Sequence, residues 1–83
     1  MTPHIGDAIQ VKVGNAYLLG RVKFSTDYFI AIDQGTGVTA ILRLDPASNC
    51  WRFGKQKVTW RVPETFHQTL LRLLALAIAN RYE

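Results

Sequence analysis

The chain contains little cysteine, few acidic residues and no long apolar run, and each shortage excludes a class of protein. With Cys50 as the single cysteine among 83 residues, no internal disulfide forms. No group of Cys and His residues has the spacing of a structural metal site, and no cofactor motif is present, so we expect neither metal nor cofactor. The longest apolar stretch, from Leu70 to Ala79, is interrupted by Arg72. It is about half as long as the roughly 20 residues of a membrane span.

The N-terminal segment also lacks the features of a secretory signal. Residues 1–6 have neither a basic region nor an apolar core. A lone free thiol is typical of a reducing compartment. We therefore expect a cytoplasmic protein with no membrane partner.

Acidic residues are missing from one whole segment. The chain has six acids against ten Lys and Arg residues and a net charge of +4. Between Asp45 and Glu64 there is no acid, while four basic residues lie there. The charge of this segment alone therefore equals that of the whole chain, which favours an acidic partner such as nucleic acid.

Motifs for catalysis are absent as well. Ser25 and Ser48 lie in turn-like contexts without a nucleophile elbow. His4 is near the N-terminus. His67 falls in the first turns of the predicted helix, on its apolar side, where a histidine is typically a boundary residue or a local hydrogen-bonding group. We predict no catalytic residue and no enzyme, leaving open only a site shared around the pore of a symmetric oligomer.

What the sequence does contain is a strand pattern. Over about the first sixty residues, apolar and polar residues alternate with period two, as in Ile9, Val11 and Val13. Turn residues such as Gly14-Asn15 and the segment 33–37 separate these runs at intervals of about ten residues. The pattern predicts a mostly β domain, a five- to six-stranded antiparallel barrel over about residues 5–62.

The second predicted strand contains an internal glycine. Leu18, Val22 and Phe24 are predicted to share one side of this strand, with Leu19, Arg21 and Lys23 on the other. Gly20 lies between them, which indicates a bend, a bulge or a close approach of two backbones.

A C-terminal helix follows over about residues 63–82 of this single domain, residues 1–83. Pro63 is suited to a first helical turn, and Glu64 is favoured near the positive end of the helix dipole. Apolar residues cover about half of the circumference, more than docking on one surface needs. Two roles stay open: closing an end of the barrel, or forming an interface with a copy of the chain or another protein. The predicted interface residues are Phe66, Leu70, Leu71, Leu74, Ile78 and Tyr82.

Three short segments together resemble a known family. They are Val13-Gly14-Asn15, Gly20-Arg21-Val22 and the acid-plus-strand run from Asp27 to Ile32. This order resembles the first motif of the Sm-like family, which includes the Hfq-type RNA chaperones, and the resemblance extends over about residues 11–53. It implies a small SH3-like or Sm-like barrel whose sheet is strongly bent near Gly20.

Basic and aromatic residues alternate in the last two strands. Because neighbouring residues of a strand face opposite sides, Trp51, Phe53 and Trp60 are predicted to point inward, and Arg52 and Arg61 outward. Outward cations on a small barrel are suited to contacting phosphates. The predicted nucleic-acid-binding residues are Arg21, Lys23, Arg43, Arg52, Lys55, Lys57 and Arg61.

We therefore expect a small non-enzymatic binding module that takes RNA or single-stranded nucleic acid on a basic outer face, with Tyr17 and Tyr28 as candidates for stacking on bases. An acidic protein is a second candidate partner, and a merely solubilising surface is the simplest interpretation of the charge. The alternative function is a protein-interaction or inhibitor module that oligomerises or docks through its C-terminal helix. A homo-oligomer is expected in either case, because a chain this short buries little core by itself.

Overall fold

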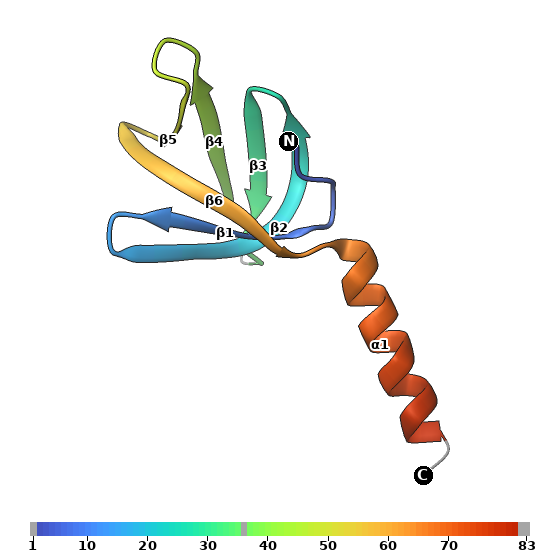
Figure 1. Cartoon of the computed structure of the whole chain (residues 1–83). Coiled ribbons are helices and arrows are strands. Elements are labelled where there is room, and N and C mark those ends of the chain that lie inside the picture. Colours follow the sequence, from blue (N-terminus) through green and yellow to red (C-terminus); the bar gives the residue numbers. More distant parts are fainter. Residues whose placement is uncertain (1, 36, 82–83) are drawn as a thin grey trace.

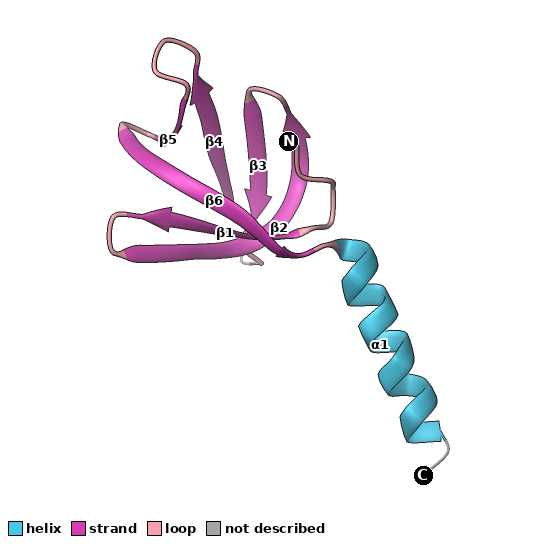
Figure 2. Cartoon of the chain, viewed as in Figure 1, coloured by secondary structure: helices cyan, strands magenta, loops and turns pink. Residues whose placement is uncertain are grey.

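The protein is a closed, six-stranded antiparallel barrel followed by one helix, as seen in the computed structural model, which describes residues 2–35 and 37–81 (Figure 1). Each strand pairs with the next in the chain, and β6 pairs with β1 to close the barrel. Figure 2 shows this division into strands and a single helix. The structure confirms the predicted small β barrel with a C-terminal helix. The elements are β1 (Ala8–Val13), β2 (Ala16–Thr26), β3 (Phe29–Asp33), β4 (Thr39–Asp45), β5 (Cys50–Phe53), β6 (Gln56–Glu64) and α1 (Phe66–Arg81).

The core is formed by the inward sides of the strands. Trp51 and Trp60 pack against it edge to face, with ring centroids 6.0 Å apart. Together with Phe53 they confirm the inward orientation predicted for the aromatic residues of the last hairpin. The buried core residues are Ile9, Val11, Val22, Ile30, Ile32, Ala40, Leu42 and Val58.

A two-residue turn joins β1 and β2, as the sequence predicts. Val13 pairs with Ala16, so only Gly14 and Asn15 lie in the turn. Gly14 has a φ of 61°, a conformation that glycine adopts without steric cost.

A register shift in β2 changes the side on which Phe24 lies. Val22 pairs with Ile32, but Phe24 pairs with the next residue, Ala31, so one residue of β2 is bulged out. Side chains beyond the bulge exchange sides. The prediction that Phe24 lies on the same side of the strand as Val22 is therefore wrong: Val22 is buried, whereas the side chain of Phe24 is 52% exposed.

Gly20 lies at a close approach of two backbones. A Cβ atom at this position would lie 2.5 Å from the carbonyl oxygen of Asp33 and 2.5 Å from Cγ2 of Ile32. Only glycine lets β2 and β3 come this close. Of the bend, bulge or close approach that the sequence left open at Gly20, the close approach is present.

The helix begins three residues later than predicted. Glu64 still pairs with Ala8, so β6 continues past Pro63. Pro63 lies at a register shift in the ladder between β1 and β6, where a residue that lacks an N–H group is tolerated. Thr65 then caps the helix: the N–H of Gln68 donates to Thr65 Oγ1 at 3.1 Å, and the N–H of Thr65 donates to Gln68 Oε1 at 2.9 Å. This reciprocal capping box decides where α1 starts.

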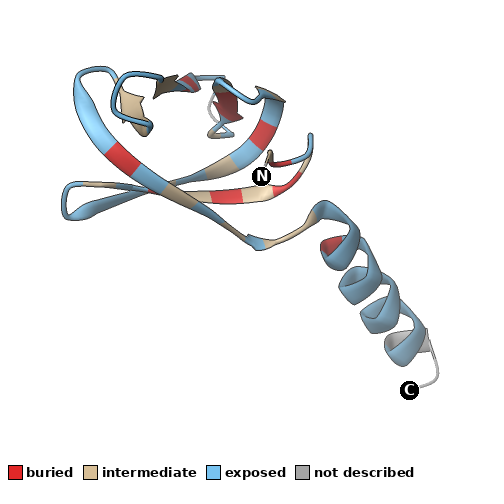
Figure 3. Ribbon diagram, turned by 45° about the horizontal axis from the view of Figure 1, so that its top comes forward, coloured by how far each residue is buried: buried red, intermediate tan, exposed pale blue. Residues whose placement is uncertain are grey.

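The helix does not cover the barrel, so its predicted role as a lid is wrong. It leaves the end of the barrel and points away from it, which gives the molecule extents of 55 × 23 × 22 Å (Figure 1). In Figure 3 the first turn of α1 includes the buried Thr69, and the following turns are exposed. The physical reason lies at the start of the helix, whose contacts set its direction.

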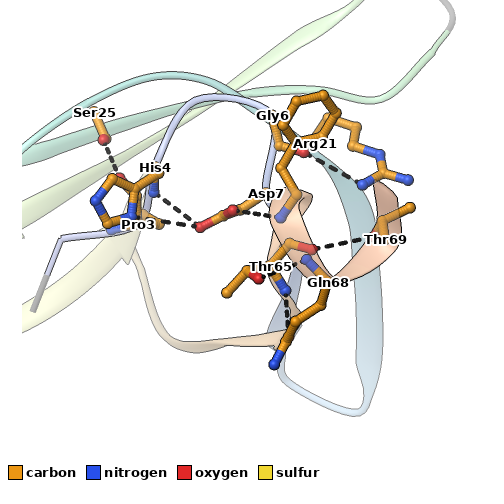
Figure 4. A network of polar contacts seen from close by, with 10 residues as sticks. Pro3, His4, Gly6, Asp7, Arg21, Ser25, Thr65, Gln68 and Thr69 are labelled. Atoms are coloured by element: carbon orange, nitrogen blue, oxygen red, sulfur yellow. Dashed lines mark hydrogen bonds and ion pairs between the residues drawn. The ribbon is translucent and has the colours of Figure 1, made fainter. Parts of the chain in front are cut away.

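Asp7 connects the start of the helix to the barrel (Figure 4). Its carboxylate is buried and accepts hydrogen bonds from the N–H groups of Phe66, at 2.8 Å, and His4, at 3.0 Å. Its backbone carbonyl accepts the N–H of Val22 in β2 at 2.9 Å. The Phe66 ring packs on Gly6, where an added Cβ would lie 3.1 Å from Phe66 Cγ. One buried residue, through its side chain and its backbone carbonyl, thus holds the N-terminal loop, β2 and α1 together.

A second contact fixes the direction of the helix. Arg72 donates through Nε to Glu64 Oε1 at 3.0 Å and through Nη2 to Glu64 Oε2 at 3.4 Å. The hydrogen bond from Arg72 is the main reason that the pKa of Glu64 lies below its ordinary value. This bidentate ion pair joins the second turn of α1 to the end of β6.

We expect Asp7→Ala to lower the free energy of unfolding by about 2–4 kcal/mol, because two N–H groups lose a buried, charged acceptor. Urea unfolding followed by tryptophan fluorescence measures the change. Asp33→Ala is the matched control, since the Asp33 carboxylate caps an exposed turn through the N–H of Gly35. An equal loss of unfolding free energy in the two variants would contradict the conclusion that the buried Asp7 carboxylate stabilises the fold more than an exposed turn carboxylate does.

We expect Gly20→Ala to cost about 1–3 kcal/mol, because its Cβ would overlap the backbone of β3. The same urea titration applies. Leu19→Ala, at a neighbouring side chain that is 63% exposed, serves as the control and changes stability much less. A Gly20→Ala protein as stable as the parent would show that β2 and β3 are free to separate.

Acid is expected to weaken the contact between α1 and β6. Because the pKa of Glu64 is lowered in the folded chain, its ion pair stabilises the fold fully above the ordinary carboxyl pKa. That contribution is lost as the pH falls through the lower, folded value. Unfolding midpoints measured from pH 7 to pH 3 test this, and the slope should flatten in Glu64→Gln. An unchanged slope in that variant would assign the acid sensitivity to other carboxyl groups.

Candidate nucleic-acid interface

Three basic residues lie side by side across the outer faces of β4, β5 and β6. Arg43 pairs with Arg52, and Arg52 pairs with Lys57. Directly paired residues of an antiparallel sheet have Cβ atoms about 4.5–5.5 Å apart, so these side chains extend from one small area. Like charges this close repel each other, and an anion bound between them relieves the repulsion.

The basic area continues along β6 onto β1. Arg61 lies on the same side of β6 as Lys57, and Thr59 lies between them. Thr59 pairs with Lys12 of β1, which adds another outward cation. We call Arg43, Arg52, Lys57, Lys12 and Arg61 together the cationic strip.

Two of these arginines are held in place by neighbouring polar groups. Arg52 Nε lies 3.3 Å from Asp45 Oδ2, and its Nη1 donates to the carbonyl of Lys55 at 3.3 Å. The pKa of Asp45 is lowered, chiefly by the hydroxyl of Ser48 and then by the N–H of Ala47 and by Arg52. A carboxylate that stays ionised keeps Arg52 oriented, at the cost of offsetting part of its charge.

Gln10 positions Arg61 at the other end of the strip. Arg61 Nε donates to Gln10 Oε1 at 2.7 Å, and the two residues are paired between β6 and β1. This uncharged partner leaves the charge of Arg61 available to a ligand.

Exposed aromatic side chains lie at both ends of the cationic strip. At one end the guanidinium of Arg43 lies 5.5 Å from the centroid of the Phe29 ring, and Phe24 contacts Phe29 edge to face at 6.0 Å. At the other end Tyr17, which is 58% exposed, pairs with Lys12. Aromatic faces beside cations are the combination on which unpaired bases stack while their phosphates are neutralised.

A shallow hollow lies over β1, β2 and β6 at the Tyr17 end. Its volume is about 370 Å³, large enough for a ligand of nucleotide size. Both of its charged lining residues belong to the strip. The lining residues are Gln10, Lys12, Tyr17, Thr59, Trp60 and Arg61.

The structure brings four of the seven predicted basic residues together and adds one. Arg43, Arg52, Lys57 and Arg61 all belong to the strip, and Lys55 lies beside it in the β5–β6 turn. Lys12 was not predicted. Its position on the polar side of the first strand was visible, but its closeness to Thr59 depends on the closure of the barrel by β1 and β6.

The other two predicted residues lie elsewhere. Arg21 Nη1 donates to the carbonyl of Gly6 at 3.3 Å, near the start of the helix, and Arg21 also contributes to the lowered pKa of Glu64. Lys23 is exposed at the register shift of β2, a strand that contributes no cation to the strip. Tyr28 is 67% exposed in the turn between β2 and β3.

Within residues 2–35 and 37–81, no group of three or more His, Cys, Asp or Glu side chains is arranged to hold a metal ion. The same part of the chain contains no helix with the length and apolar character needed to cross a membrane.

Comparisons with protein-family models, with curated proteins and with solved structures find no match to this chain, so its function is inferred from the geometry of its own residues.

Proposed function

We propose that this protein is a nucleic-acid-binding module that holds single-stranded RNA or DNA along the cationic strip. The observation that carries the proposal is the continuity of the strip: five cations on four neighbouring strands, accompanied by Asp45 as the one acid bonded within it. The cations lie on strands whose backbone is already fixed, so little backbone freedom is lost when phosphates bind.

A single strand fits this surface better than a duplex. Sequence-specific contacts to a duplex need an element that enters a groove, and here the cations lie on the outer wall of a barrel. The exposed rings at the two ends of the strip stack on bases only when the bases are unpaired. Phe24 joins this surface because the bulge in β2 turns it outward.

The SH3-like or Sm-like character of the barrel is part of the same proposal. A long β2 that passes Gly20 and a register shift supports it, because such features bend a sheet strongly enough to close a small barrel. The described residues place a capped helix after β6, whereas Sm proteins normally begin with a helix.

The alternative, a protein-interaction or inhibitor module, draws its support from α1. Its apolar side chains are exposed along the helix, as an interface requires. The strip and the helix lie on different elements, so nucleic-acid binding and association through the helix are compatible.

The logarithm of the affinity for a fluorescent single-stranded oligonucleotide is expected to fall linearly with the logarithm of salt concentration. For single strands the slope is about −0.7 for each phosphate neutralised. Arg43→Ala and Lys57→Ala should each make the slope shallower by about 0.7, and the double variant by about 1.4. Fluorescence anisotropy at several salt concentrations measures it.

Lys23→Ala is the matched control, since it removes one exposed cation outside the strip. If it changes the slope as much as Lys57→Ala, binding is a property of net charge and not of the strip. Absence of binding to both RNA and DNA at low salt would leave the basic surface with a solubilising role only.

Tyr17→Leu tests the aromatic contribution separately. We expect it to weaken binding by about 1–3 kcal/mol if Tyr17 stacks on a base. The salt slope should stay unchanged, because no charge is removed. Tyr28→Leu, at an exposed tyrosine beyond the Arg43 end of the strip, shows whether the effect is specific to the Tyr17 end. An unchanged affinity in Tyr17→Leu would exclude stacking at this end.

A further inference from the structure

The helix carries a large apolar surface that its own barrel leaves uncovered. Seven large apolar side chains along it are between 47% and 58% exposed: Phe66, Leu70, Leu71, Leu73, Leu74, Leu76 and Ile78. Together they expose roughly 600 Å², as large as the largest apolar patches found on monomeric proteins. The same area approaches the roughly 800 Å² that each partner buries in a standard interface.

The helix is also held in a fixed position from one end only. Asp7, the Thr65 capping box and the Glu64–Arg72 pair all act within its first two turns. The remaining turns extend into solvent, and an isolated helix of 16 residues is marginally stable in water. Its outer turns therefore need contacts from another molecule.

The angular distribution of these side chains shows how many neighbours the helix needs. Viewed down the helix axis, with 100° between successive residues, the large apolar side chains lie within an arc of roughly 220°. In angular order this arc runs from Leu76 past Phe66 to Leu71. Docking against one surface uses about 100°. Leu76 lies alone at one edge of the arc, roughly 60° beyond Leu73. The other apolar side chains form two seams about 100° apart, one of Phe66, Leu70, Leu73 and Ala77 and one of Leu71, Leu74 and Ile78.

We propose that the helices of three or more copies of this chain pack into a bundle, each helix meeting two neighbours through its two seams. Two seams at such an angle place the neighbours on different sides, as in a closed ring of helices. The opposite side of the helix, which we call the polar side, contains Gln68 and Arg72 with the small residue Ala79 between them, and it then faces outward.

Charge favours a copy of the same chain as the occupant. Among the side chains of α1 that the structure describes, Arg72 is the single Lys or Arg, and it is bonded to Glu64. Arg72 therefore lies outside both seams when copies pack together. A helix lying on a lipid surface instead carries several Lys or Arg residues opposite its apolar side. Tyr82, which the sequence places at the same interface, is outside the described residues.

The mass of the full chain in solution tests the proposal, measured by sedimentation equilibrium without nucleic acid. We expect at least three times the 9.4 kDa of one chain. Leu74→Glu and Ile78→Glu should each reduce the mass to that of one chain. Ala79→Glu, which adds the same charge on the polar side, is the control and should leave the assembly intact. Near-ultraviolet circular dichroism of Trp51 and Trp60 reports whether the barrel remains folded.

Three results would overturn the proposal: a parent chain that stays at one or two copies up to high concentration, equal effects of Leu74→Glu and Ala79→Glu, or variants that keep the parent mass. Flotation with vesicles of phosphatidylcholine and phosphatidylglycerol gives a further check. A monomeric parent that floats with them, with binding lost in Leu74→Glu, would identify a lipid surface as the occupant.

Discussion

The position of the helix depends on the buried carboxylate of Asp7. A carboxylate this buried is stable only when its oxygens accept hydrogen bonds, and the N–H groups of Phe66 and His4 supply them. Because Phe66 is the first residue of α1, this bond fixes the place from which the helix leaves the barrel. The Glu64–Arg72 pair then fixes its direction, and the apolar turns beyond it stay exposed.

Local patterns in the sequence were enough to predict the strands and the inward rings. Period two placed Ile9 and Val11 in the core, and Gly20 marked the close approach of β2 and β3. The orientation of Phe24 could not be predicted from period two, because one bulged residue reverses the alternation. The start of the helix was misplaced at Pro63, although Thr65 and Gln68 form a capping box that the sequence already contains.

The basic site was only partly predictable because it depends on pairings between distant strands. Arg52 and Lys57 belong to one hairpin, so their closeness follows from a turn of known length. Lys12 is remote in sequence and joins them only when β6 closes on β1. Arg21, which shares the outward pattern, instead bonds to Gly6 beside the helix. Alternation determines which residues point outward, but the register decides which of them meet.

The two proposals concern different surfaces, and their combination has a physical consequence. The strip runs over β4, β5, β6 and β1, whereas the proposed bundle uses α1 alone. Each copy in a bundle would therefore keep its strip accessible. A nucleic-acid strand bound to one strip would meet the next at a high effective concentration, so modest affinity at each strip would become tight binding by the assembly. A strip of only five cations on each chain would gain most from such repetition, because the contribution of phosphate contacts to its affinity weakens at physiological salt.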